Sequence, residues 1–150
     1  MEQLLLVLPG FFLGLVPGWW YRKRRLKVHW GALRAEVVLC REKAETYLND
    51  KVMAPLYRLP MKAFETSYPV LLADAALTES EVKELSRLYG LIEDLNRGLE
   101  NAAELAKRDQ VNILKSEFNR NCIKAKKLIP PNRDGDNLYS RGLAIIESHI

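Results

Sequence analysis

The chain has 150 residues, about the length of one domain, with 23 Lys and Arg against 19 Asp and Glu, a net charge of +4. Residues 22–35 hold six of the basic side chains and no acid, so residues 36–150, with 17 basic and 18 acidic side chains, are nearly neutral. Because a nucleic-acid-binding domain needs a basic face on its folded body, this distribution argues for no nucleic acid among the partners.

The first 21 residues contain the longest uncharged stretch. No charged side chain occurs from Gln3 to Tyr21, and a basic run at 22–27 follows directly. As a helix, the part from Leu4 to Tyr21 would be about 27 Å long, slightly under the roughly 30 Å hydrocarbon core of a bilayer. We therefore expect a transmembrane anchor at residues 1–21, with membrane lipid as a partner.

The charges flanking this stretch predict its orientation. Lys and Arg follow the anchor and only Glu2 precedes it, so the positive-inside rule places the N-terminus outside and residues 22–150 in the cytoplasm. The expected protein is single-pass, and we take the membrane to be a bacterial inner membrane. Three alternatives are weighed against a spanning helix: a cleaved signal peptide, which needs its basic residues before the apolar run; a re-entrant segment broken at Pro9 and Pro17; and a buried hairpin of a soluble protein.

Two sets of residues in this region are candidate functional residues. Gly10, Gly14 and Gly18 recur every four residues, a spacing that lets two membrane helices approach closely and self-associate, although two of them follow prolines and could mark kinks. The residues expected to contact lipid headgroups are Trp19, Trp20, Tyr21, Arg22, Lys23, Arg24, Arg25 and Lys27. The basic run could also serve only to set the topology.

A long helix is predicted to follow, ending near residues 50–54. One apolar stripe supports it, with spacings of three and four: Leu26, Trp30, Leu33, Val37, Cys40, Ala44 and Tyr47. This stripe could face a second chain in a coiled coil, but its small residues favour packing inside one domain.

Residues 55–78 form a Pro-rich apolar connector that must pack on the bundle, the bilayer or a partner, since it carries too many apolar groups to leave in water. Within it we expect a short helix at about 68–76, with Ser67 as N-cap and Pro69 in the first turn. Its aromatic and Met-bearing part is the candidate partner surface, with core packing as the alternative: Tyr57, Met61, Phe64 and Tyr68.

Three further helices are predicted. Thr78 and Glu81 fit a capping box for a helix to about Lys107, in which Gly90 and Gly98 mark a kink or a close crossing. Asp109 is expected to cap a helix at 110–128, and a last helix covers about 138–148. The fold class is therefore all-α: one N-terminal transmembrane helix and a bundle of three to four helices.

No motif for chemistry is recognised in the sequence. Cys40 and Cys122 are far apart and are expected to be reduced thiols, and neither His29 nor His149 stands in a metal-binding pattern. No phosphate-binding, dinucleotide or nucleophile motif occurs, so we predict no catalytic residue, metal or cofactor and no enzyme activity.

The predicted function is that of a membrane-tethered helical interaction module or accessory subunit that self-associates or docks on another membrane protein. The first alternative is a membrane-perturbing effector that oligomerises through its anchor. The second is an enzyme acting on a membrane-borne substrate.

Overall fold

The computed structural model describes the backbone of residues 2–130 and 136–150, and the side chains of residues 18–130 and 136–150. Five helices and no strand occur in these ranges, so the all-α prediction is confirmed, with five helices where three to four were expected in the bundle. They are α1 (Glu2–Asp50), α2 (Lys62–Ala73), α3 (Glu79–Lys107), α4 (Val111–Lys126) and α5 (Leu138–Ser148).

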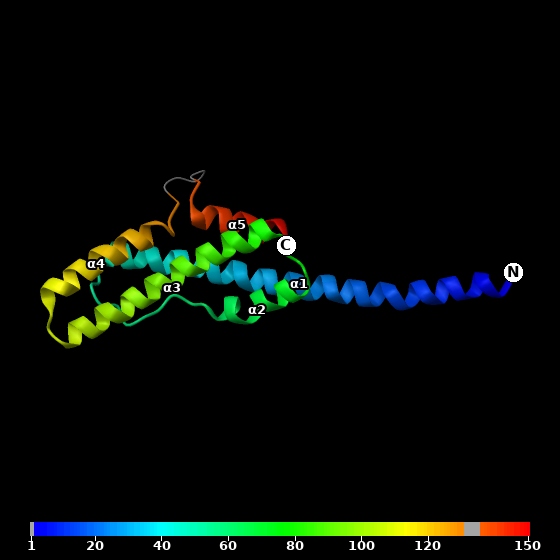
Figure 1. The fold of residues 1–150 in the computed structure, drawn as a ribbon, viewed down its shortest axis with the longest axis horizontal. Coiled ribbons are helices and arrows are strands. Elements are labelled where there is room, and N and C mark those ends of the chain that lie inside the picture. Colours follow the sequence, from blue (N-terminus) through cyan, green and yellow to red (C-terminus); the bar gives the residue numbers. More distant parts are fainter. Residues whose placement is uncertain (1, 131–135) are drawn as a thin grey trace.

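Helix α1 is the central element of the bundle. Its second half contacts α2, α4 and α5, and its first half continues beyond them toward the N-terminus (Figure 1). The predicted apolar stripe is the side that packs: Trp30, Leu33, Val37, Cys40, Ala44 and Tyr47 are all buried. The prediction that this stripe packs within one chain is therefore confirmed. A coiled-coil seam along the stripe is excluded because the other helices of the bundle already cover its side chains.

The expected anchor falls largely on residues whose side chains are not described. Only residues 18–21 of the stretch 1–21 belong to the part with described side chains, and Gly10 and Gly14 lie outside it. Among the described residues, no helix has the length and apolar character needed to cross a membrane. The backbone of α1 runs without interruption from Glu2 through this stretch into the bundle.

Helix α2 begins six residues earlier than predicted, so the expected N-cap at Ser67 is wrong. Its first amides are bound by a carboxylate from α1: Glu36 accepts hydrogen bonds from the backbone N–H groups of Ala63 (2.6 Å) and Phe64 (2.9 Å). Pro69 lies inside the helix, on its exposed side, where water can satisfy the carbonyl that proline leaves without a donor.

The connector before α2 packs on the bundle through a buried amide. Asn96 of α3 accepts a hydrogen bond from the backbone N–H of Leu59 (2.7 Å) and donates one to its carbonyl (3.0 Å). Leu59 itself is buried in the core. The bundle therefore covers this part of the connector.

The predicted capping box at the start of α3 is confirmed, whereas the predicted Asp109 cap of α4 is wrong. The Thr78 and Glu81 side chains form the capping box reciprocally. Asp109 instead takes a left-handed conformation (φ 55°) in the turn between the two helices, and Gln110 precedes α4 without a side-chain cap. Aspartate tolerates this conformation better than most residues do, which explains its presence in the turn.

Helices α3 and α4 cross closely at Gly98. A Cβ atom there would lie 1.9 Å from Oδ1 of the fully buried Asn121, whereas one at Gly90 would meet nothing within 4 Å. We expect Gly90→Ala to raise the free energy of unfolding by about 0.5–1 kcal/mol through helix propensity, and Gly98→Ala to lower it by about 1–3 kcal/mol. Urea unfolding measures both.

The control for this crossing is the double variant. Truncating Asn121 to alanine in the Gly98→Ala background removes the clash, so the double variant should be more stable than the Gly98→Ala variant. Equal effects of alanine at positions 90 and 98 would contradict a close crossing.

Candidate functional site

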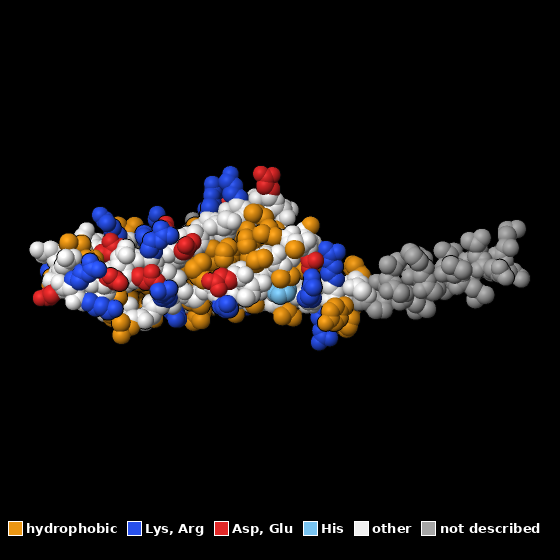
Figure 2. Space-filling view, turned by 60° about the horizontal axis from the view of Figure 1, so that its bottom comes forward, with side chains coloured by type: hydrophobic (Ala, Val, Ile, Leu, Met, Phe, Trp, Pro, Cys, Tyr) orange, Lys and Arg blue, Asp and Glu red, His pale blue; other side chains and the backbone are white. Residues whose placement is uncertain are grey.

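Aromatic and basic side chains surround α1 at the point where it leaves the bundle. Trp19, Trp20 and Tyr21 are 65%, 59% and 73% exposed. Lys23 Nζ lies 5.3 Å from the ring centroid of Trp19, and the Arg24 guanidinium lies 5.7 Å from that of Trp20. Figure 2 shows Lys and Arg side chains beside hydrophobic ones at this end of the body.

Two of the basic residues bind the end of α2. Arg25 Nη2 donates to Asp74 Oδ2 (2.6 Å), and Arg22 Nη2 donates to the Asp74 carbonyl oxygen (2.7 Å). The hydrogen bond from Arg25, aided by the positive charge of both arginines, holds the pKa of Asp74 below its usual value. Next along α1, His29 Nδ1 lies 3.0 Å from Ser67 Oγ, so this side of α1 is occupied by α2.

The other basic side chains point away from α2. Lys23, Arg24 and Lys27 form no ion pair with any carboxylate among the described residues. The basic run, expected to act as one unit, is thus divided by the fold into a pair of residues that bind α2 and three that remain open. A sequence alone could not reveal this division, because Asp74 lies about 50 residues farther along the chain.

The candidate partner surface lies mostly against the bundle. Phe64 stacks on Tyr89 with ring centroids 3.9 Å apart, and on Tyr68 with centroids 4.6 Å apart. Tyr68 is 8% exposed and its hydroxyl lies 3.1 Å from Ser86 Oγ. Met61 and Tyr57 are partly buried and pack against the core. These four residues chiefly join the connector and α2 to α1 and α3.

One apolar side chain of the connector, expected to be covered like the others, is instead almost fully exposed. Leu56 is 96% exposed, next to a cavity of about 310 Å³ between the connector and α3. Its neighbours Val52 and Met53 are also exposed, at 43% and 40%. Turn chemistry rather than periodicity governs residues 51–56, so no amphipathic pattern marked them.

The two cysteines are free thiols, in agreement with the prediction. Cys40 is 1% exposed and its Sγ lies 3.3 Å from the carbonyl oxygen of Pro60. Burial, followed by the nearby negative charge of Glu36, raises the pKa of the Cys40 thiol to about 12. A thiol held protonated in this way is a packing group and a poor nucleophile.

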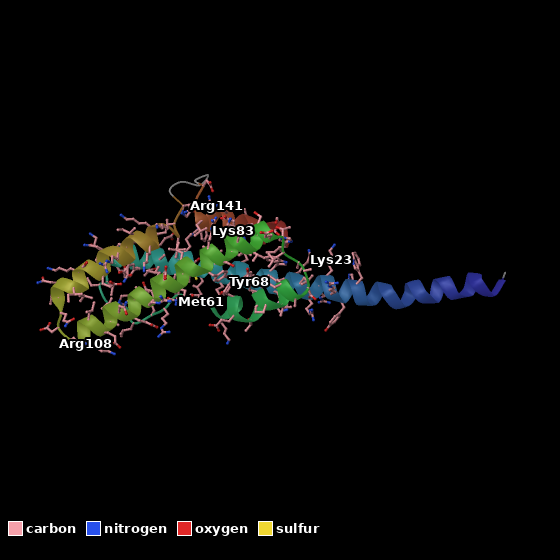
Figure 3. All side chains as sticks on the ribbon, in the orientation of Figure 1. Lys23, Met61, Tyr68, Lys83, Arg108 and Arg141 are labelled. Carbon is pink, nitrogen blue, oxygen red and sulfur yellow. The ribbon has the colours of Figure 1, made fainter. Side chains whose placement is uncertain are left out.

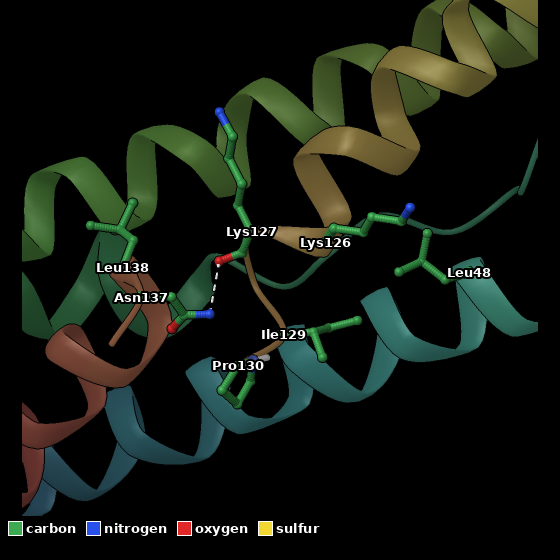
Figure 4. Close-up of a pocket in the computed structure, with 7 residues that line it drawn as sticks. All are labelled: Leu48, Lys126, Lys127, Ile129, Pro130, Asn137 and Leu138. Atoms are coloured by element: carbon green, nitrogen blue, oxygen red, sulfur yellow. Dashed lines mark hydrogen bonds between the residues drawn. The ribbon is translucent and has the colours of Figure 1, made fainter. Parts of the chain in front are cut away.

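A cavity of about 610 Å³ lies between the end of α4 and the start of α5 (Figure 4). Its lining is mainly apolar: Leu48, Ile129, Pro130 and Leu138, with Lys126, Lys127 and Asn137 as the polar members. Asn137 Nδ2 donates to the Lys127 carbonyl oxygen (3.4 Å) across one side. None of these lining side chains is a carboxylate, imidazole or thiol.

Within residues 18–130 and 136–150, no three His, Cys, Asp or Glu side chains are grouped so that they could hold a metal ion. Comparisons of the chain with protein-family models, with curated proteins and with solved structures found no match.

Proposed function

We propose that this chain is a membrane-tethered helical interaction module or accessory subunit, with its N-terminus outside and its helical body on the cytoplasmic side. The observation that carries the proposal is the continuity of α1. The helix that forms the centre of the bundle is the same helix that bears the uncharged run Gln3–Tyr21, and no loop separates the two parts. Such a connection holds the body at a fixed position relative to whatever surrounds the first half of α1.

The residues at the exit of α1 support a bilayer as that surrounding. Exposed indole and phenol rings followed by cationic side chains are the sequence of groups found at a membrane interface, with rings at the headgroup level and charges on the aqueous side. The uncharged run of 19 residues that ends in these rings, Gln3–Tyr21, is long enough to span the apolar core of a bilayer as a helix.

Self-association is the second part of the proposal. Gly18 and Gly31 of α1 both have open space where a Cβ atom would lie. Helical periodicity places three residues on one side of α1: Gly14, Val28 and Leu39. Val28 is 67% exposed and Leu39 is 41% exposed. Gly10 and Gly14 continue the four-residue spacing of Gly18, so a second α1 could pack along this side.

A charged substitution in the uncharged run tests the tether. We expect the full chain to remain in the membrane fraction after carbonate extraction, and Leu13→Arg to release most of it, since an arginine at mid-bilayer costs about 2.5–3.5 kcal/mol. Crosslinking of intact membranes should give a homodimer with the unchanged chain and much less with the variant.

The matched control is Leu56→Arg, the same change at a fully solvated position of the body. It should leave both membrane retention and crosslinking as they were. A full chain that carbonate extracts completely without any substitution would overturn the proposal.

A further inference from the structure

One face of α1 at its exit from the bundle carries cations without acidic partners beside exposed indole rings, and we propose that this face binds the headgroups of anionic phospholipids. The inference rests on the proposed membrane tether and names the lipid that the tether recognises. The face consists of Trp19, Trp20, Lys23, Arg24 and Lys27, here called the exit face.

The spacing of these residues places them together. Trp19, Lys23 and Lys27 are four residues apart, as are Trp20 and Arg24, so each set lies in a row along the helix. The five side chains line one shallow cavity of about 350 Å³. That volume lies on the solvent side of α1, opposite the side on which Arg22 and Arg25 bind Asp74.

The charge on the exit face is uncompensated. The described residues offer it no carboxylate within ion-pairing distance. Arg24 is distinctive in this respect, because every other described arginine has an acidic partner, as in the pairs of Glu93 with Arg97 and Glu104 with Arg108, whereas most lysines of the body have none. Arg24 can offer a planar fork to a phosphate, and the two lysines add point charges on either side. Three cations arranged in this way attract an anion at modest ionic strength.

The indole rings point to lipid as the source of that anion. Trp19 and Trp20 leave 65% and 59% of their surface open, directly beside the cations. A free phosphate ion would satisfy the charge and leave both rings in water. A phospholipid supplies the phosphate together with a glycerol and acyl region that covers the rings, which is the environment that Trp prefers in membranes.

Brominated lipids test this assignment, because bromine quenches tryptophan fluorescence only at short range. The full chain is reconstituted into phosphatidylcholine vesicles that contain either brominated phosphatidylglycerol or brominated phosphatidylcholine at the same mole fraction. Of the three tryptophans, Trp30 is buried at 2% exposure, so Trp19 and Trp20 report the contact. We expect the anionic lipid to quench at least about threefold more strongly, and the difference to shrink as salt rises.

Two triple variants with equal charge changes form the comparison. Lys23→Gln with Arg24→Gln and Lys27→Gln should bring the quenching ratio to about one. Lys107→Gln with Arg108→Gln and Lys115→Gln removes the same residue types at the opposite end of the bundle and should leave the ratio unchanged; Figure 3 shows Lys23 and Arg108 at these two ends.

Four results would overturn the proposal. Equal quenching by the two brominated lipids would contradict the headgroup site but not the membrane tether. No quenching by either lipid would contradict both. Loss of the anionic preference in both triple variants would show that net charge, not the exit face, governs it. Inorganic phosphate added at constant ionic strength should leave the ratio unchanged, and a phosphate that abolishes it would assign the face to the free ion.

Discussion

Replacing Trp30 with alanine should lower the free energy of unfolding by about 3–5 kcal/mol, the cost of removing a large buried aromatic ring. Trp30 is 2% exposed and belongs to the stripe by which α1 packs into the bundle. Its ring stacks on that of His149, with centroids 4.4 Å apart and planes inclined by 4°. The substitution therefore opens a cavity beside α1 and removes the surface on which the C-terminal residues rest.

The loss should extend from α1 to the start of α3. His149 Nε2 lies 2.8 Å from Glu81 Oε1, and Glu81 also closes the capping box with Thr78. Burial raises the pKa of Glu81, but hydrogen bonds from Thr78 and His149 outweigh it and hold this pKa below its usual value. Since the folded state keeps Glu81 charged, the contribution of these bonds is present above the ordinary glutamate pKa and is lost as the pH falls through the lowered one.

Urea unfolding of the full chain in mild detergent, followed by circular dichroism, measures the effect of Trp30→Ala. The matched control is Trp19→Ala, the same chemical change on the same helix at a position that is 65% exposed. That control should change the free energy of unfolding by less than about 0.5 kcal/mol. Similar losses from the two substitutions would contradict the assignment of the second half of α1 to the bundle core.

Local patterns in the sequence predicted most of the helices. The stripe from Trp30 to Tyr47 and the capping box at Thr78 are encoded by residues three and four apart, which a helix brings together whatever the rest of the chain does. The start of α2 could not be predicted in this way. Its cap comes from Glu36, about 27 residues before it in sequence and on another helix, and Ser67 is instead occupied by His29.

For the candidate site too, the features that depend on local contacts could be predicted from the sequence, and those that depend on distant contacts could not. The cluster of aromatic and basic residues at 19–27 was evident from composition. Which of those cations remain open depends on Asp74, which α2 brings to Arg22 and Arg25. In the connector, Phe64 and Tyr68 were compatible with a partner surface or a core. The stacking of Phe64 on Tyr68 and on Tyr89 could be seen only once α2 was packed on α1 and α3.

The carboxylate of Glu36 carries the second large expected effect: Glu36→Ala should lower the free energy of unfolding by about 2–4 kcal/mol. The side chain is 6% exposed, and both of its oxygens accept backbone N–H groups at the first turn of α2. A negative charge at a helix N-terminus is favoured by the helix dipole, and its removal leaves two donors without acceptors in a region that water reaches poorly. Alanine is itself a better helix former than glutamate, so the loss in α1 cannot come from helix propensity.

Two variants isolate the cap. Glu42→Ala makes the same change at an exposed position of α1 and should alter the free energy of unfolding by less than about 0.5 kcal/mol. Glu36→Gln keeps one acceptor oxygen and loses the charge, so its effect should fall between those of the two alanine variants. Amide hydrogen exchange gives the local readout: in Glu36→Ala the N–H groups of Ala63 and Phe64 should exchange at least about tenfold faster, because α2 opens from its first turn. If these two amides keep their protection, the buried carboxylate is not what holds α2 against α1.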